Sequence, residues 1–231
     1  MEVPVSAVDK AALREAICHA GHRAFQAGLV AANDGNISVR CGDGHYLITP
    51  SGVSKGDLTP DMILEIDGAG MPVDGKGKPS VETKMHLGIY ETQPDLNAVV
   101  HTHAPHCVLL STMETMLTAP LTADAVVLLG NVPVLPYAQL GTQALADGVA
   151  QASADYNAAL LQNHGAVTWG RTIQEAWFAM EALEQYCRQL YMQRLLGNPG
   201  RLMTRAEADG LVAVRKGRGV TRGGDHMPPE A

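Results

Sequence analysis

The stretch NAVVHTHAPHCVLL, residues 97–110, places two histidines in an otherwise apolar run. The β-branched residues before them predict a strand over 97–103, in which residues two apart share a face. His101 and His103 would then lie about 6.5 Å apart on one face, close enough for both imidazoles to bind one metal ion. A lone buried histidine is more often a hydrogen-bonded core residue, but two on one face favour a metal site.

A third candidate ligand follows in AALLQNHGAVTWG, residues 158–170, which we interpret as two strands joined at a turn that contains His164. The adjacent Gly165 allows the backbone to bend tightly and to present the imidazole at a strand end. Catalytic zinc sites commonly have three protein ligands and an open position. The sequence therefore predicts a site for Zn²⁺, or for another divalent ion such as Mn²⁺ or Co²⁺.

Glu82 lies in KPSVETKMH, where a helix is expected to begin near Ser80. An acidic residue in the first turn favours the helix dipole, which is a purely structural explanation. The functional alternative is a fourth ligand that substrate displaces, so that the carboxylate can move a proton beside the metal. His86, one turn later, is given no metal role because the other histidines already supply the ligands.

The same helix start would bind an anion, since its first backbone N–H groups have no partner within the helix. Two small-residue loops could complete an anion site: DGNIS, residues 34–38, and TPSG, residues 49–52. Each loop alone is only a weak turn signal. Together with the histidines they form an ordered set.

The rest of the chain alternates between helical and extended patterns and shows no internal repeat. We interpret it as one α/β domain of mixed sheet and helices over residues 1–231, with its core at about 10–195 and a mobile tail at about 219–231. The predicted helices are 9–27, 81–93, one from about 105, 142–154 and 172–197; the predicted strands are 45–50, 62–66, 97–103 and the two in 158–170, with 128–141 extended.

The overall composition limits the partners of the protein. A net charge of −7 argues against binding to nucleic acid or to an anionic membrane through a basic surface. Four widely spaced cysteines favour reduced thiols and a cytoplasmic location. We find no signal-peptide core and no apolar run of the roughly 18 residues that a membrane span requires.

The motifs GNIS, TPSG, PSVE, HTHAPH and QNHG occur in the order and spacing of the class II aldolase/epimerase family, which this chain resembles over roughly residues 10–195. The resemblance implies a three-layer α/β/α fold with a central mixed, largely antiparallel sheet. It also implies a homotetramer with active sites at the subunit interfaces and a sugar phosphate as substrate.

The resemblance also implies roles for individual residues. The three histidines would bind zinc, and Glu82 would be the acid/base of the aldolase branch. Substrate phosphate would be held by Asn36, Ser51, Gly52 and Ser80. The expected reaction is cleavage of a ketose 1-phosphate, either fuculose-1-phosphate-like or a 5-deoxy- or 5-methylthio-ribulose 1-phosphate, to dihydroxyacetone phosphate and an aldehyde.

The chain departs from the fuculose-1-phosphate aldolase pattern in three places. It has Ser80-Val81 where that enzyme has two serines, no tyrosine follows Tyr191, and LTADAV replaces a segment that carries a tyrosine. We therefore expect Asp124 to move the proton at the aldehyde end of the substrate in a neighbouring subunit. A 4-epimerase, a dehydratase or a decarboxylase on the same metal site remain alternatives, and an adducin-like binding module ranks last because the ligands are all present.

Overall fold

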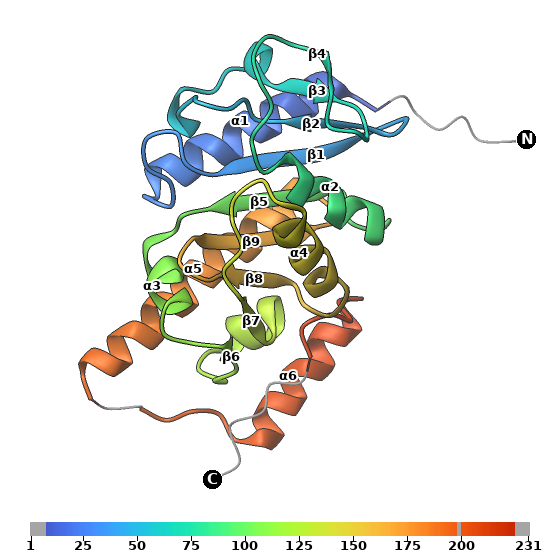
Figure 1. The fold of residues 1–231 in the computed structure, drawn as a ribbon. Helices are drawn as coiled ribbons and strands as arrows, with labels where there is room; N and C mark the ends of the chain where they lie inside the picture. The colour runs from blue at the N-terminus through green and yellow to red at the C-terminus, as the bar shows by residue number, and fades with distance from the viewer. Residues whose placement is uncertain (1–7, 198–199, 225–231) are drawn as a thin grey trace, which may run out of the picture.

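A nine-stranded sheet forms the centre of the computed structural model, which describes residues 8–197 and 200–224. Figure 1 shows the strands stacked in the order β4-β3-β2-β1-β5-β9-β8-β7-β6. Neighbouring strands run antiparallel except for the parallel pair β7–β8. The strands are β1 (Asn36–Gly42), β2 (His45–Ile48), β3 (Leu64–Ile66), β4 (Pro72–Asp74), β5 (Ala98–Thr102), β6 (Met116–Leu117), β7 (Val132–Leu135), β8 (Ala158–Leu161) and β9 (Gly165–Gly170).

Helices cover both faces of this sheet, because successive strand residues point to opposite sides. In β5, Ala98 and Val100 belong to one hydrophobic cluster and Val99 to the other. The first cluster includes residues of α1 (Lys10–Gln26), α3 (Pro105–Ser111) and α5 (Ile173–Leu195). The second includes residues of α2 (Thr83–Thr92) and α4 (Gln143–Asp155). The three-layer α/β/α fold with a mixed, largely antiparallel sheet is confirmed.

The central strands bring distant parts of the chain into register. His101 in β5 pairs with Asn36 in β1 on one side and with Val167 in β9 on the other. Because residues in register share a face, the side chain of Asn36 emerges beside that of His101. This face is the one that α2 and α4 cover.

Three local expectations need correction. Asn36 to Ser38 were expected in a loop, but they begin β1, whose alternating side chains pack on both faces. Helix α2 begins at Thr83 and not near Ser80. Residues Ala125–Leu129, which overlap the segment expected to be extended, form a single π-helical turn, η3.

A further helix, α6 (Arg205–Gly217), was not predicted from the sequence; Figure 1 shows it beside the lower strands. It begins with a complete capping box, in which Thr204 and Glu207 satisfy each other's backbone N–H groups. Thr172 and Glu175 at the start of α5 have the same spacing but form only half of a capping box. The Thr172 hydroxyl accepts from the Glu175 N–H, but the Glu175 carboxylate accepts from the N–H of Arg171 and not from that of Thr172.

The beginning of the segment expected to be a mobile tail is held by hydrogen bonds. The Gly223 carbonyl accepts from the N–H of Asn131, and the Gly223 N–H donates to Asp155. The Arg222 guanidinium pairs with the Asp95 carboxylate at 2.9 Å. Residues 225–231 of that segment lie outside the described residues.

Two expectations from composition can be compared with the structure. All four cysteines are free and buried, as expected of reduced thiols. Among the described residues, none of the helices combines the length and the apolar character that a membrane span requires.

Candidate metal centre and active site

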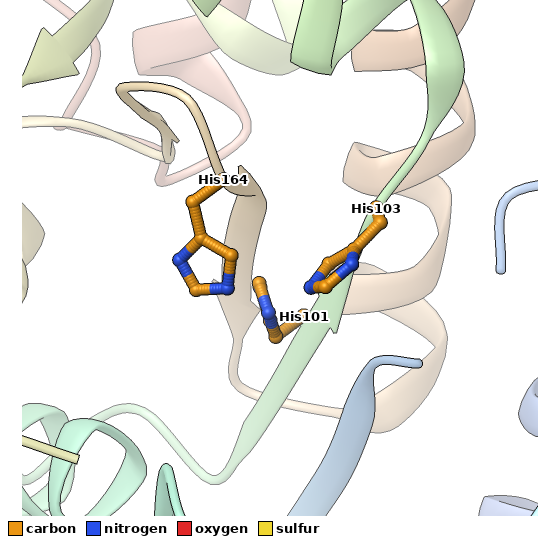
Figure 2. Close-up of side chains that lie close together, drawn as sticks. All are labelled: His101, His103 and His164. Carbon is orange, nitrogen blue, oxygen red and sulfur yellow. The ribbon is translucent and has the colours of Figure 1, made fainter. Parts of the chain in front are cut away.

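Three histidines converge at the end of β5 and the start of β9 (Figure 2). The ring centroids lie 5.1 Å apart for His101 and His103, 4.7 Å for His101 and His164, and 4.9 Å for His103 and His164. One ring nitrogen from each residue can be chosen so that all three lie within 4.8 Å of one another. The structure therefore brings together the three side chains that the sequence proposed as metal ligands.

The local backbone determines this convergence. A Cβ atom on Gly165 would lie 2.5 Å from the Thr102 carbonyl oxygen and 3.0 Å from the His103 ring, so only glycine fits beside the histidines. The His101 Nδ1 lies 2.9 Å from the Ala166 carbonyl oxygen. Since a carbonyl only accepts, Nδ1 of His101 carries a proton, and Nε2 is the ring nitrogen that faces the site and could bind a metal.

The carboxylate of Glu82 faces two of these rings. Its Oε2 lies 3.1 Å from His101 Nε2, and its Oε1 lies 3.3 Å from His164 Nε2. Glu82 occupies the N-cap position of α2, but its side chain makes no capping hydrogen bond. Support for the helix start therefore does not explain why this carboxylate is buried among the histidines.

The residues present fit a divalent cation. Nε2 of His101, both ring nitrogens of His164 and Oε1 of Glu82 are buried without a hydrogen-bond partner. A buried polar atom without a partner typically costs about 1–3 kcal/mol, so several together at one point need a common explanation. A cation between imidazole lone pairs and a carboxylate would supply it, and nitrogen and oxygen ligands of this kind suit Zn²⁺.

The electrostatics of the site agree with this assignment. Burial opposes ionisation of Glu82, but His101 and the hydrogen bond from Asn36 outweigh it and hold the pKa of the carboxyl well below its usual range. Burial, helped by the charge of His101, lowers the pKa of His164 to about 4. At neutral pH the site thus offers an ionised Glu82 carboxylate and a neutral His164 imidazole, which are the forms that bind metals. Burial lowers the pKa of His101, but Glu82 outweighs burial and raises that pKa, so the Nε2 proton of His101 would have to leave when a metal binds.

Two of the four residues expected to hold phosphate, Asn36 and Ser80, lie next to Glu82. The Asn36 amide donates to the Ser80 hydroxyl at 2.9 Å, and that hydroxyl accepts from the Glu82 N–H at 3.2 Å. Ser51 and Gly52 are exposed in the turn after β2, whose backbone is joined to the segment before Ser80. The Ser51 N–H already donates to the Lys78 carbonyl, so Ser51 has its hydroxyl to offer a ligand.

Asp124 lies elsewhere in the chain. It is exposed just before η3 and lines a groove with Glu181 and Gln185 of α5, the helix that covers the opposite face of the sheet from α2. The structure thus does not bring Asp124 to the histidines of its own chain.

Two further side chains at this site, Asp34 and His86, were not predicted from the sequence as part of it. Asp34 places Oδ2 3.4 Å from His103 Nδ1. His86 is buried and hydrogen-bonded to Asn36, whose amide also contacts Glu82. Asp34 lies in one of the two loops predicted to form an anion site. The role of His86 could not be predicted, because its hydrogen-bond partners belong to β1, and that strand was not predicted.

The family model for the class II aldolase and adducin N-terminal domain matches residues 15–191. The chain belongs to the class II aldolase and adducin family. A 3-oxo-tetronate 4-phosphate decarboxylase of Escherichia coli strain CFT073 is 36% identical over 200 residues, which cover 84% of this chain and 92% of that protein. An L-fuculose phosphate aldolase of the same strain is 39% identical over 169 residues, covering 73% and 77%.

Solved structures of this family have the same fold. YgbL of Escherichia coli, described as an aldolase, epimerase or decarboxylase, superposes with a TM-score of 0.81 at 32% identity and covers 88% of this chain and 99% of its own. Members of the class II aldolase family with named activities include both a decarboxylase and an aldolase, which are both lyases.

Proposed function

We propose that the protein is a metal-dependent lyase that decarboxylates a 3-oxo-tetronate 4-phosphate or a similar phosphorylated 3-oxo acid. The observation that supports lyase activity is the position of the Glu82 carboxylate, which faces His101 and His164 in a buried site. Decarboxylation is preferred over the aldol cleavage expected from sequence because the decarboxylase relative aligns over more of both chains than the aldolase does.

His101, His103 and His164 would hold the metal, for which we propose Zn²⁺. When bound, a divalent cation supplies Lewis-acid stabilisation of the negative charge that develops on a substrate oxygen. Asn36, Ser51, Gly52 and Ser80 would hold the substrate phosphate at the edge of the site, close to the start of α2.

The protein's own part in the reaction is to hold substrate and to move one proton. Loss of CO₂ breaks the C1–C2 bond of the 3-oxo acid, and the electron pair of that bond forms an enediolate across C2 and C3. Glu82, which is ionised in the resting site, takes up one proton from water and delivers it to C2, which gives dihydroxyacetone phosphate. The carboxylate is then ionised again, so the reaction consumes one proton and releases one CO₂.

Aldol cleavage of a ketose 1-phosphate is the second candidate, because the aldolase relative is 39% identical over the region it shares. This reaction reaches the same enediolate, and Glu82 would protonate it in the same way. It also requires a base for the hydroxyl proton at the aldehyde end, which is the role we expect for Asp124. The epimerase, dehydratase and adducin-like alternatives have no further observation in their favour.

We also propose that the protein works as a homotetramer with sites between subunits, which would allow Asp124 to reach the site of a neighbour. Its exposed position before η3 is compatible with such a contact. Sedimentation equilibrium of the metal-loaded protein tests the tetramer.

The experiment that tests the function compares two substrates. The metal-loaded protein is incubated with 3-oxo-tetronate 4-phosphate or with fuculose 1-phosphate, and dihydroxyacetone phosphate is detected with a coupled dehydrogenase. Release of CO₂ from the first substrate supports decarboxylation. Formation of an aldehyde from the second, with no CO₂ from the first, would replace the proposal by the aldolase.

A further inference from the structure

A chain of buried hydrogen bonds leads away from Glu82 into the layer between β1 and α2. The Asn36 amide nitrogen donates to Glu82 Oε2 at 2.8 Å, and the Asn36 Oδ1 lies 2.5 Å from His86 Nε2. The His86 Nδ1 lies 2.6 Å from the Ser38 hydroxyl, which lies 2.8 Å from the hydroxyl of Tyr90. All five side chains are at most 5% exposed.

Ionised Glu82 fixes the direction of every bond in this chain. A carboxylate only accepts, so the Asn36 NH₂ group must face it, and the Asn36 oxygen must face His86. His86 therefore carries its proton on Nε2, and its Nδ1 accepts from the Ser38 hydroxyl. The Ser38 oxygen in turn accepts from Tyr90. Burial lowers the pKa of His86 to about 3, so the imidazole is neutral, as this pattern requires.

The two oxygens of Glu82 consequently differ. Oε2 is occupied by the Asn36 donor, whereas Oε1 is buried without a hydrogen-bond partner beside His164. A proton that arrives on Oε1 leaves the hydrogen bond at Oε2 intact. A proton on Oε2 would meet the N–H of Asn36.

We propose that His86 is a positioning residue that fixes the orientation of the Asn36 amide and thereby directs the transferred proton to Oε1 of Glu82. The proposal rests on the proposed function for the role of Glu82. With the orientation reversed, the Asn36 oxygen would face the Glu82 carboxylate, and the Ser80 hydroxyl would lose one of its two donors and keep only the Glu82 N–H. His86 thus acts on both the acid/base and one phosphate-binding residue through a single amide.

The tautomer of His86 tests the arrangement independently of activity. The metal-loaded protein is labelled with ¹⁵N-histidine, and long-range ¹H–¹⁵N NMR spectra are recorded. We expect them to show a neutral His86 ring with the proton on Nε2. The His86 signals are assigned as those that disappear in His86→Gln. A proton on Nδ1 would overturn the proposal. Because no substrate is present, this result stands even if neither proposed reaction occurs.

The positioning role is tested with two substitutions at one site. His86→Phe keeps a ring but cannot hydrogen-bond, whereas His86→Gln has an N–H for Asn36 and an oxygen for Ser38. Loss of a residue that orients an active-site group typically lowers activity roughly 10- to 100-fold. We expect His86→Phe to slow solvent proton exchange of dihydroxyacetone phosphate by this factor with metal content unchanged, and His86→Gln to recover most of the rate.

Tyr186→Phe is the matched control, since it removes a buried hydroxyl that donates to the Ala119 carbonyl away from the site. Equal rates for wild type and His86→Phe, or equal losses in His86→Phe and His86→Gln, would overturn the positioning role. If the wild-type protein neither exchanges the proton nor turns over either substrate, the proposed function fails, whereas the NMR result still decides the arrangement.

Discussion

Asn36 and His101 lie directly opposite each other in the antiparallel pair β1–β5, at the centre of the sheet. The pairing places the amide that contacts Glu82 next to the imidazole that the same carboxylate faces. The residues proposed for metal binding, proton transfer and phosphate binding therefore depend on one short stretch of sheet register.

The first prediction concerns the metal. We expect close to one divalent ion per chain, and a loss of affinity by orders of magnitude on replacing His101, His103 or His164 by Ala, because each removes a direct metal–nitrogen bond. Elemental analysis after dialysis measures it. His45→Gln is the control, since His45 pairs with Glu65. Full metal content in all three Ala variants would contradict the site.

Glu82→Gln separates proton transfer from support of the fold. The amide keeps the size of the side chain but cannot carry the proton, and loss of a general acid or base slows a reaction roughly 100-fold or more. Loss of an N-cap interaction costs only about 1 kcal/mol. We expect a folded, metal-loaded protein that no longer exchanges a dihydroxyacetone phosphate proton with deuterated water by NMR. Unchanged exchange would show that another group moves the proton.

Gly165→Ala should impair the site through geometry alone. The new Cβ would lie 2.5 Å from the Thr102 carbonyl oxygen and 3.1 Å from the His101 ring, so β5 and β9 must separate or the rings must turn. We expect weaker metal binding and a lower thermal midpoint. Gly148→Ala in α4 has no atom within 4 Å of its new Cβ and should stabilise the helix by about 0.5–1 kcal/mol. Normal metal affinity in Gly165→Ala would show that the contact is readily relieved.

A pH dependence follows from Lys55, whose buried ammonium donates to the carbonyls of Asn33 and Val53 at 3.1 and 2.9 Å. Burial lowers the pKa of Lys55 from 10.5 to about 8, although Asp34 opposes the shift. Between these pKa values the unfolded chain holds a proton that the folded chain has released, so the contribution of Lys55 to stability rises with pH.

We therefore expect Lys55→Met to lower the free energy of unfolding by more above about pH 9 than near pH 7. Urea unfolding of both proteins at the two pH values measures the difference. A cost that stays constant or shrinks with rising pH would show that the pKa of Lys55 is not lowered in the folded protein.

Asp124→Asn distinguishes the two candidate reactions. Aldol cleavage needs a base for the hydroxyl proton at the aldehyde end, whereas decarboxylation has no such step. We expect unchanged CO₂ release from 3-oxo-tetronate 4-phosphate and a reduced rate with any ketose 1-phosphate that is cleaved. Both rates are followed with the same dehydrogenase coupling. A loss of decarboxylation with intact metal content would give Asp124 a part in the proposed reaction.

The histidines could be predicted from sequence because their spacing matches the strand period, and His164 because a glycine follows it. His86 could not, since its role depends on Ser38 and Asn36, which sit in a strand that was interpreted as a loop. The small polar residues that suggested a loop are the ones whose side chains face the buried network.

Helix α6, which was not predicted, does have a signal in the sequence. Thr204 and Glu207 stand in capping-box spacing, followed by an amphipathic segment. The position of Asp124 was beyond prediction for a different reason: a π-helical turn depends on packing against α5 and α6, which local sequence does not reveal.

The proposed metal ligands lie at the end of β5 and just before β9, and this location bears on how such a protein can acquire new substrates. A change at Asn36, His101 or Gly165 alters the middle of the sheet, where neighbours on both sides resist it. Ser51 and Gly52 lie in an exposed turn and Asp124 is exposed just before η3, so all three are outside the sheet. Selectivity can therefore be redesigned at these positions while the residues proposed for proton transfer stay intact, which makes this scaffold suited to directed evolution.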